Sequence, residues 1–359
     1  MTNMKNILLI GYDSNICLGV SYCLSQLNNK MIFLLTSNSK NAGRYSRFIK
    51  RTIIYDKKSI DIARLKEIIS DLNINLIFPY DEEEGIFISE HKHLLESNTT
   101  KCIWLTPTEN YKIGVNKHLL AKFLHEADIS VPNFIQKEKK EDVIDEISSW
   151  QSEFIMKPAR SSFGRGIIKF KNIDEFKIYA NNNRIDFSTT LFQPYIQGSD
   201  ITANVLANNG EVLYHTVQET PIKSGTRFVS GDEFEFRTDQ NVIALVKKAI
   251  KKLNWSGVAC FDLRRNSLTG EIFILEINGR FWASLVAAFE KGGINFPELL
   301  AQLAFEEKIS TPINKYFKQI SFFSFISSLW RRKKYKLKDT KYIPYLKDPI
   351  GRFFQIMNW

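Results

Sequence analysis

The segment Ile274-Leu-Glu-Ile-Asn-Gly-Arg-Phe-Trp-Ala-Ser-Leu285 begins as an apolar strand and then carries polar side chains at every second position. Alternate side chains of a strand point to the same face. Glu276, Asn278 and Arg280 are therefore expected on one face. Two explanations remain open: this face borders solvent at the edge of a sheet, or it lines a polar site.

A second apolar strand just upstream supplies another carboxylate. Gly257–Leu263 contains Asp262, and a tight turn at Asn266–Gly270 leads into the strand of Glu276. A hairpin brings the two carboxylates together only if its register places Asp262 opposite or diagonal to Glu276. Two carboxylates and the amide oxygen of Asn278 suit a hard divalent ion such as Mg²⁺ that also binds phosphate oxygens. The segment therefore predicts a metal–nucleotide site, on that condition.

A lysine at the end of a strand precedes a loop rich in glycine and serine. Phe154–Pro158 reads as a buried strand that contains Lys157. The small residues after it let backbone N–H groups approach a phosphate closely, while the lysine adds a positive charge. An ordinary hairpin loop is the alternative. The candidate phosphate contacts in the loop are Ser161, Ser162, Gly164 and Gly166.

Two further segments offer contacts for a nucleotide. In Leu191–Asp200, a purine can lie against Tyr195 and Ile196, and Asp200 can accept hydrogen bonds from ribose hydroxyls. The alternative is a strand that leaves the edge of a sheet. Lys117 stands at the start of an expected helix, where a solvated surface lysine is the simpler explanation.

The order of the expected elements indicates the fold class. Strand-like and helix-like segments alternate over the first hundred residues, which favours a parallel sheet covered by helices. From Phe154 onward the strands are short and joined by turns, which favours antiparallel sheets with interspersed helices. We therefore expect an α/β domain followed by an α+β body.

Composition indicates which kind of partner and which cellular compartment to expect. The 359 residues include 49 Lys and Arg against 39 Asp and Glu, a net charge of +10 that favours anionic partners. No nucleic-acid recognition motif surrounds the basic residues, so nucleic acid is not the expected partner. Without a C-x-x-C pair or a secretory apolar segment, we expect reduced thiols and a cytoplasmic protein. The cysteines are Cys17, Cys23, Cys102 and Cys260.

The collinear order of these motifs resembles the ATP-grasp superfamily over about residues 1–305. The resemblance is strongest to the carbamoyl-phosphate-synthetase-like and carboxylate–amine ligase branches, whose phosphate loop follows a Lys-Pro pair and whose metal strand reads Glu-x-Asn-x-Arg. The pairs here are Lys157-Pro158 and Glu276-Ile-Asn-Gly-Arg280. The resemblance implies a Rossmann-like pre-ATP-grasp domain over 1–105, an N-terminal ATP-grasp subdomain with the phosphate loop over 106–190, a C-terminal subdomain with the metal site over 191–310, and a basic and aromatic appendage over 311–359.

The resemblance also implies a role for each candidate residue. Lys117 and Lys157 contact the phosphates of ATP, and residues 161–166 form a mobile flap over them. Arg280 lies beside the transferred phosphate, with Lys157 as its catalytic partner. Asp200 takes the ribose position, where relatives commonly carry Glu. The adenine hinge is Gln193, Tyr195 and Ile196, and the ligands of Mg²⁺, with Mn²⁺ as a substitute, are Asp262, Glu276 and Asn278.

The function implied is ligation of a small-molecule carboxylate to an amine through an acyl phosphate, with release of ADP and phosphate. The alternatives are a thiol or another non-carboxylate acceptor, or a regulatory protein that binds nucleotide without turnover. In the glycine- and hydroxyl-rich loop between His215 and Arg237, Lys223 and Arg227 are candidates for binding the carboxylate, against a merely solvated loop.

The C-terminal residues carry a separate signal. Six of the eight residues from Arg331 to Lys338 are basic, and they follow the aromatic-rich segment Ile320–Trp330. This combination is compatible with contact to an anionic membrane surface, but a solvated charged face is the favoured explanation. The aromatic segment is too short and too rich in serine to span a bilayer.

Overall fold

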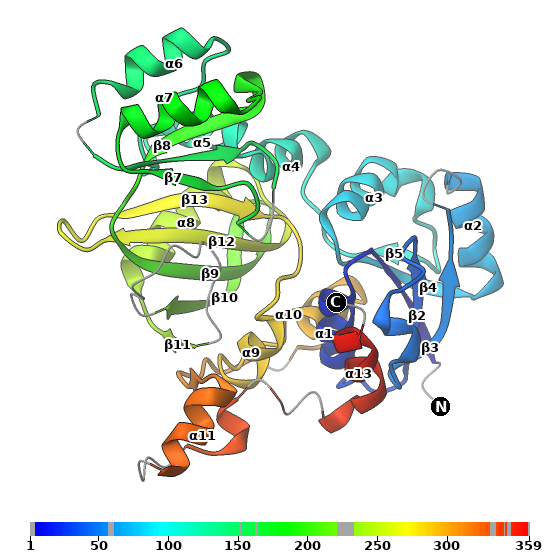
Figure 1. Cartoon of the computed structure of the whole chain (residues 1–359). Coiled ribbons are helices and arrows are strands. Elements are labelled where there is room, and N and C mark those ends of the chain that lie inside the picture. Colours follow the sequence, from blue (N-terminus) through cyan, green and yellow to red (C-terminus); the bar gives the residue numbers. More distant parts are fainter. Residues whose placement is uncertain are drawn as a thin grey trace.

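The computed structural model describes residues 4–56, 61–150, 152–161, 164–220, 233–309, 311–330, 335–340, 342 and 346–357. Within these residues the strands form a five-stranded, a six-stranded and a three-stranded sheet (Figure 1). The first sheet is parallel and the other two are antiparallel, as the sequence predicts. Lys223 and Arg227, Ser162, and half of the basic run 331–338 lie outside the described residues.

The parallel sheet near the N-terminus has the strand order β3-β2-β1-β4-β5 and is covered on both faces. Ile7 and Leu9 of β1 face helix α1, whereas Leu8 and Ile10 face α2 and α3. Burial on both sides explains why these strands are continuously apolar. The elements are β1 (Lys5–Ile10), α1 (Ser14–Leu24), β2 (Lys30–Thr36), η1 (Ala42–Tyr45), β3 (Ile49–Ile54), α2 (Ile62–Asp71), β4 (Ile74–Pro79), α3 (Glu82–Leu95) and β5 (Lys101–Cys102).

The three-stranded sheet forms a small α+β layer of its own. Its strand order is β7-β6-β8, and Phe154, Phe170, Phe176 and Phe192 pack together between the sheet and helices α6 and α7. Two helices, α4 and α5, precede this layer in the chain. The elements are α4 (Thr108–Val115), α5 (Lys117–Glu126), α6 (Lys140–Ile147), β6 (Phe154–Pro158), β7 (Ile168–Phe170), α7 (Ile173–Asn182), η2 (Phe187–Thr189) and β8 (Thr190–Pro194).

The six-stranded sheet has the order β13-β12-β9-β10-β11-β14 and two unlike faces. Ile201, Ala203 and Phe261 pack against α8, α4 and α5 on the apolar face. The intervening residues Thr202 and Asp262 point to the opposite face, which lines a cavity. The elements are β9 (Gly198–Asn208), β10 (Glu211–Thr220), β11 (Phe234–Arg237), α8 (Gln240–Lys252), β12 (Gly257–Asn266), β13 (Ile272–Asn278) and β14 (Lys318–Gln319).

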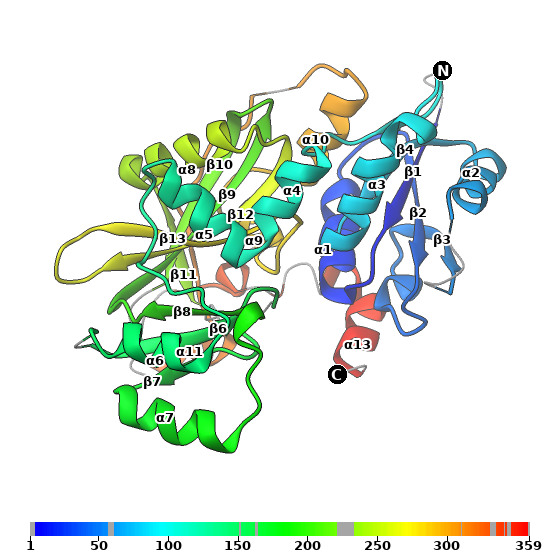
Figure 2. The ribbon, with the colours of Figure 1, turned by 90° about the horizontal axis from the view of Figure 1, so that it is seen from above.

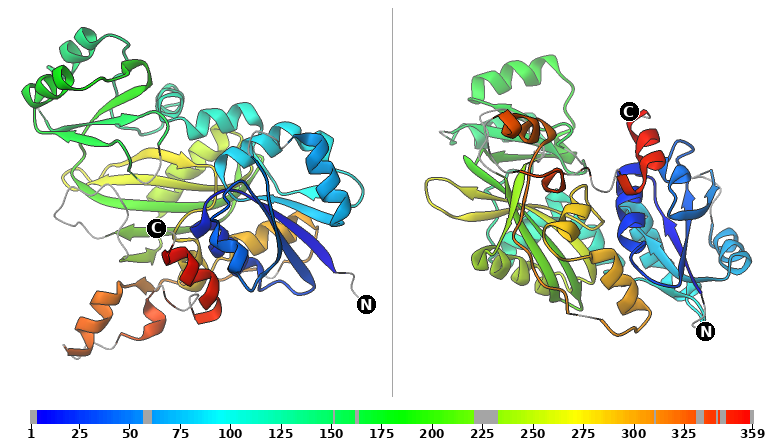
Figure 3. Two further views of the ribbon diagram at one scale, coloured as in Figure 1. Left: turned by 45° about the vertical axis from the view of Figure 1, so that its right-hand side comes forward. Right: turned by 90° about the horizontal axis from the view of Figure 1, so that it is seen from below.

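The chain then returns to the N-terminal sheet. Helices α9 (Leu285–Glu290) and α10 (Phe296–Ala304) pack on α1, and the C-terminal helix α13 (Pro349–Met357) contacts both α1 and η1. Figures 1 and 3 show this red helix beside α1, while α11 (Phe322–Trp330) projects away from the sheets. In Figure 2 the N-terminal and six-stranded sheets lie side by side. Among the described helices, including the short η3 (Leu337–Asp339), we find none with the length and apolarity to cross a membrane.

Candidate functional site

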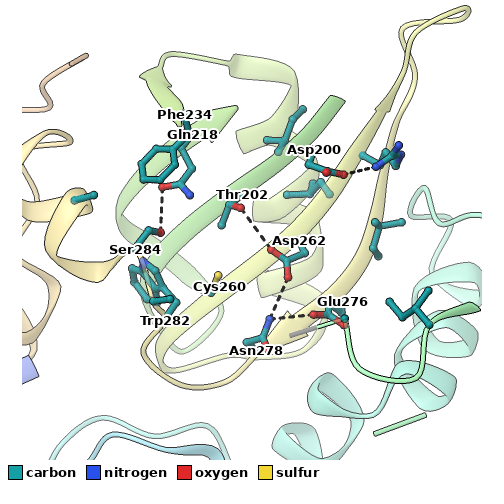
Figure 4. Close-up of a pocket in the computed structure, with 18 of the residues that line it drawn as sticks. Asp200, Thr202, Gln218, Phe234, Cys260, Asp262, Glu276, Asn278, Trp282 and Ser284 are labelled. Atoms are coloured by element: carbon teal, nitrogen blue, oxygen red, sulfur yellow. Dashed lines mark hydrogen bonds and ion pairs between the residues drawn. The ribbon is translucent and has the colours of Figure 1, made fainter. Parts of the chain in front are cut away.

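The centre of the site is the β12–β13 hairpin. Asp262 lies directly opposite Glu276, and Cys260 lies opposite Asn278, so the register condition is met. The amide nitrogen of Asn278 lies 3.4 Å from Asp262 Oδ2 and 3.4 Å from Glu276 Oε1 (Figure 4). The hydroxyl of Thr202 lies 3.5 Å from Asp262 Oδ1. The polar alternation of the sequence thus faces the cavity rather than open solvent.

Burial makes this pair of carboxylates electrostatically costly. Loss of hydration raises the pKa of Asp262 well above its usual value, and the neighbouring charge of Glu276 raises it further. Burial also opposes ionisation of Glu276, but the nearby ammonium of Lys117 lowers the pKa of Glu276 overall. A cation between the two carboxylates would offset their repulsion, so the electrostatics of the pair fit a metal site.

The number of donors also fits Mg²⁺, which usually combines one or two carboxylates with phosphate oxygens and water. No group of three or more His, Cys, Asp and Glu side chains placed to hold a metal occurs among the described residues. Phosphate oxygens and water would therefore complete the coordination. Asn278 now turns its NH₂ group toward the carboxylates, and ligation through its oxygen requires the amide to flip.

Two buried lysines approach the hairpin from other elements. Lys117 Nζ lies 2.9 Å from Glu276 Oε2 and donates to the Ser161 carbonyl at 2.7 Å. Asn116 caps α5 by accepting from the backbone N–H groups of His118 and Leu119, which fixes Lys117 at the start of the helix. Lys157 Nζ donates to the Leu275 carbonyl at 3.4 Å, and burial lowers its pKa to about 8. Both lysines can neutralise phosphate charge.

The loop after Lys157 needs glycine for its conformation. Gly164 and Gly166 have φ angles of 68° and 76°, where only glycine is unstrained. A Cβ atom at Gly166 would lie 2.8 Å from Cγ of Pro158. Ser161 and Gly164 line the cavity, so the described part of the predicted phosphate loop borders the site.

The predicted nucleotide hinge also borders the cavity, through Gln193, Tyr195, Ile196 and Asp200. Gln193 is buried, and its Oε1 has no hydrogen-bond partner among the described residues. Lys169 Nζ lies 3.8 Å from the centroid of the Tyr195 ring, and Cζ of the Arg264 guanidinium lies 5.0 Å from the same centroid. A purine stacked on this ring would have to share it with these cations.

Asp200 and Arg280 have partners that their predicted roles must accommodate. Asp200 forms an ion pair with Arg264, so a ribose hydroxyl would add to an acceptor already in use. Arg280 lies just beyond the end of β13, lines the cavity and donates to the Phe281 carbonyl at 2.7 Å. Its charge lowers the pKa of Asp262, against the larger effect of burial.

The cavity of about 840 Å³ extends beyond the predicted nucleotide contacts. Gln218 accepts a hydrogen bond from Ser284 at 3.2 Å on its wall (Figure 4). Asn15, Arg352 and Gln355 line its far end. Sequence reasoning missed these residues because no motif marks α13 and because the Gly11–Gly19 segment has no dinucleotide fingerprint.

Comparison with known proteins identifies the family of the central part of the chain. A model of the ATP-grasp domain family matches residues 115–284. This part of the chain is an ATP-grasp domain. It includes Lys117, Lys157 and the whole β12–β13 hairpin, whereas Asn15 and Arg352 lie outside the match. The predicted family is confirmed for residues 115–284.

Relatives of the ATP-grasp domain include ligases. The D-alanine–D-alanine ligase of Acetivibrio thermocellus is 25% identical over 217 residues, which cover 53% of this chain. The match spans only 57% of that ligase. Solved structures also share the fold. N5-carboxyaminoimidazole synthetase of Staphylococcus aureus, solved with ADP, has a TM-score of 0.71 at 14% identity, covering 92% of this chain and 87% of that one. The L-amino acid ligase of Bacillus licheniformis has a TM-score of 0.65 at 13% identity, covering 87% and 76%.

Proposed function

We propose that the protein is an ATP-dependent carboxylate–amine ligase that releases ADP and phosphate. The observation that carries this proposal is the pairing of Asp262 with Glu276 in a cavity of an ATP-grasp domain. The buried Lys157 lines the same cavity, and the buried Lys117 forms an ion pair with Glu276. The ligase relatives support the reaction class, and the size of the cavity leaves room for substrates next to a nucleotide.

In this proposal Asp262, Glu276 and Asn278 hold Mg²⁺, and Mn²⁺ suits the same oxygen donors. The bound ion supplies charge neutralisation at the phosphate oxygens. Lys157 and Lys117 add positive charge to the phosphate region, and Gly164 and Gly166 let the loop backbone approach it. Gln193, Tyr195, Ile196 and Asp200 surround the nucleoside.

The chemical task is to turn a carboxylate into an electrophile. A carboxylate oxygen attacks the γ-phosphorus of ATP, and the bond from that phosphorus to the bridging oxygen of ADP breaks. The amine then attacks the carbonyl carbon of the acyl phosphate, loses a proton, and displaces inorganic phosphate. Arg280 beside the carboxylates of the site can stabilise the negative charge that develops on the transferred group. No covalent enzyme nucleophile is required.

The test is ADP formation from Mg-ATP with paired pools of carboxylates and amines, for wild type, Glu276→Gln and the control Glu109→Gln. Glu109 is an exposed residue of α4. ADP formation should require both substrates and should fall at least 100-fold in Glu276→Gln alone. With hydroxylamine in place of the amine, an acyl phosphate yields a hydroxamate. Equal ADP formation in wild type and Glu276→Gln would refute the proposed site, and ADP formed without any carboxylate would refute the reaction.

A further inference from the structure

The far end of the cavity is built from two elements that lie outside the ATP-grasp domain match. Asn15 belongs to the first turn of α1, and Arg352 and Gln355 lie on the inner face of α13. Arg352 Nη1 donates to Gln355 Oε1 at 2.8 Å and to Asn15 Oδ1 at 3.3 Å. Gln355 Nε2 donates to the same Asn15 oxygen at 2.8 Å. We name these three residues the α13 corner.

The fold holds the α13 corner in place. Phe354 stacks on Tyr45 of η1 with ring centroids 3.8 Å apart, and Asp348 accepts from the backbone N–H of Arg47 at 3.1 Å. Arg352 is only 5% exposed, whereas Ile350 and Phe353 of the same helix are largely exposed. Burying a guanidinium instead of an apolar side chain costs free energy. The helix therefore accepts a cost in stability to place a positive charge at the cavity wall.

Charge and polarity of this end indicate the kind of group that fits it. Among the described residues that line the cavity, α13 contributes Arg352, and the end of α9 contributes Lys291, which donates to the Lys338 carbonyl, and Glu290, which accepts from the Tyr22 hydroxyl. Arg280 lines the cavity beside Asp262. Val286 and Ile356 contribute apolar wall to the same cavity. A guanidinium presents its N–H groups as a planar fork that matches carboxylate and phosphate oxygens.

We propose that the α13 corner binds a second oxyanion of the substrate, a carboxylate or a phosphate, away from the carboxylate that reacts. The substrate would then be at least dianionic, with an apolar stretch between its two charged ends. This inference rests on the proposed function, because the bound molecule is a substrate only if the protein is a ligase. Anion binding at Arg352 is itself independent of turnover.

The test measures anion binding to the full chain saturated with Mg²⁺ and AMP-PNP, which fills the nucleotide site including the γ-phosphate position. Inorganic phosphate and succinate are titrated separately by calorimetry. One of them should bind at millimolar concentration, and Arg352→Met should weaken it at least 10-fold. Tighter phosphate binding indicates a phosphorylated substrate, and tighter succinate binding indicates a second carboxylate.

Two variants keep the test decisive if Arg352→Met does not fold. Asn15→Asp retains an acceptor for Arg352 and Gln355 while adding a negative charge, so it should also weaken anion binding at least 10-fold. Arg51→Met removes an exposed charge from β3 and should leave binding unchanged. Binding of neither anion to wild type, or undiminished binding to Asn15→Asp, would overturn the proposal. If neither anion binds but Mg-ATP is still turned over, the ligase proposal stands and only the anion-binding proposal fails. If an anion binds at the α13 corner but no ADP is formed, only the ligase proposal fails.

Discussion

Asp262 of β12 faces Glu276 of β13 directly across the hairpin, and Lys117 from α5 reaches Glu276 at 2.9 Å. Strand pairing therefore brings two carboxylates together on a buried face, where their repulsion is poorly screened. The lysine offsets the charge of Glu276 and leaves Asp262 with the raised pKa. This arrangement is unfavourable for the protein alone and favourable for a protein with a cation bound between the strands.

Asp262→Asn should separate stability from activity. Removing one of the two buried carboxylates relieves their repulsion, so the free energy of unfolding without metal should rise by about 1 kcal/mol at pH 7. Loss of a metal ligand should lower Mg-ATP-dependent ADP formation at least 100-fold. Urea denaturation and an ADP assay measure the two effects. Asp174→Asn, at an exposed position of α7, should change neither by more than about 0.5 kcal/mol or 2-fold. A clear loss of stability in Asp262→Asn would contradict this account.

The amino-acid sequence predicts the order of the sheets and the polar face of β13 because alternation with period two is a local property. It does not predict the register of Asp262 against Glu276, since register depends on where the hairpin begins to pair. The sequence also does not predict the far end of the cavity. Asn15 and Arg352 are 337 positions apart, and only the return of α13 to α1 joins them.

Side-chain contacts are a second limit of sequence reasoning. The segment around Tyr195 predicts a flat contact for a purine, but Lys169 and Arg264 already approach its ring. Lys169 comes from β7 of the three-stranded sheet and Arg264 from β12 of the six-stranded sheet, so their proximity to Tyr195 is set by tertiary packing. The predicted roles of Tyr195 and Asp200 in nucleotide binding remain predictions.

Gly166→Ala should impair the phosphate loop beyond its cost in backbone strain. The residue has φ 76°, and the added methyl group would lie 2.8 Å from Pro158 Cγ, next to Lys157. Gly270→Ala is a matched control, because Gly270 has φ 75° but no atom within 4 Å of the added methyl group. Gly270→Ala should lose about 1 kcal/mol of unfolding free energy from backbone strain, and Gly166→Ala should lose more because of its contact with Pro158. Only Gly166→Ala should raise the KM for ATP, by at least 5-fold. An equal KM for both variants would show that the loop conformation does not control ATP binding.

Lys157 should take up a proton when ATP binds above pH 8. Burial lowers its pKa to about 8, so the free protein loses this charge as the pH rises through 8, although an exposed lysine would keep it to about 10.5. Phosphate beside the amine would favour the charged form and draw a proton from the buffer. Calorimetry of Mg-AMP-PNP binding at pH 8.5, in buffers of different ionisation enthalpy, measures this uptake. Lys157→Arg should abolish it, and Lys122→Arg, at an exposed position of α5, should not. Uptake that persists in Lys157→Arg would assign the proton to another group.

His118 should make the fold less stable below neutral pH. Burial on α5 lowers its pKa from 6.5, and the charge of Lys157 lowers it further, so the folded chain keeps the imidazole neutral. The unfolded chain binds a proton as the pH falls below about 6.5, while the folded chain binds it only at lower pH. The free energy of unfolding should therefore fall with decreasing pH between the two pKa values, by at most about 1.4 kcal/mol per pH unit. Urea denaturation between pH 7.5 and 5 measures the slope. His118→Gln should flatten it, while His93→Gln, on the exposed side of α3, should retain it. If both variants keep the wild-type slope, another group controls acid stability.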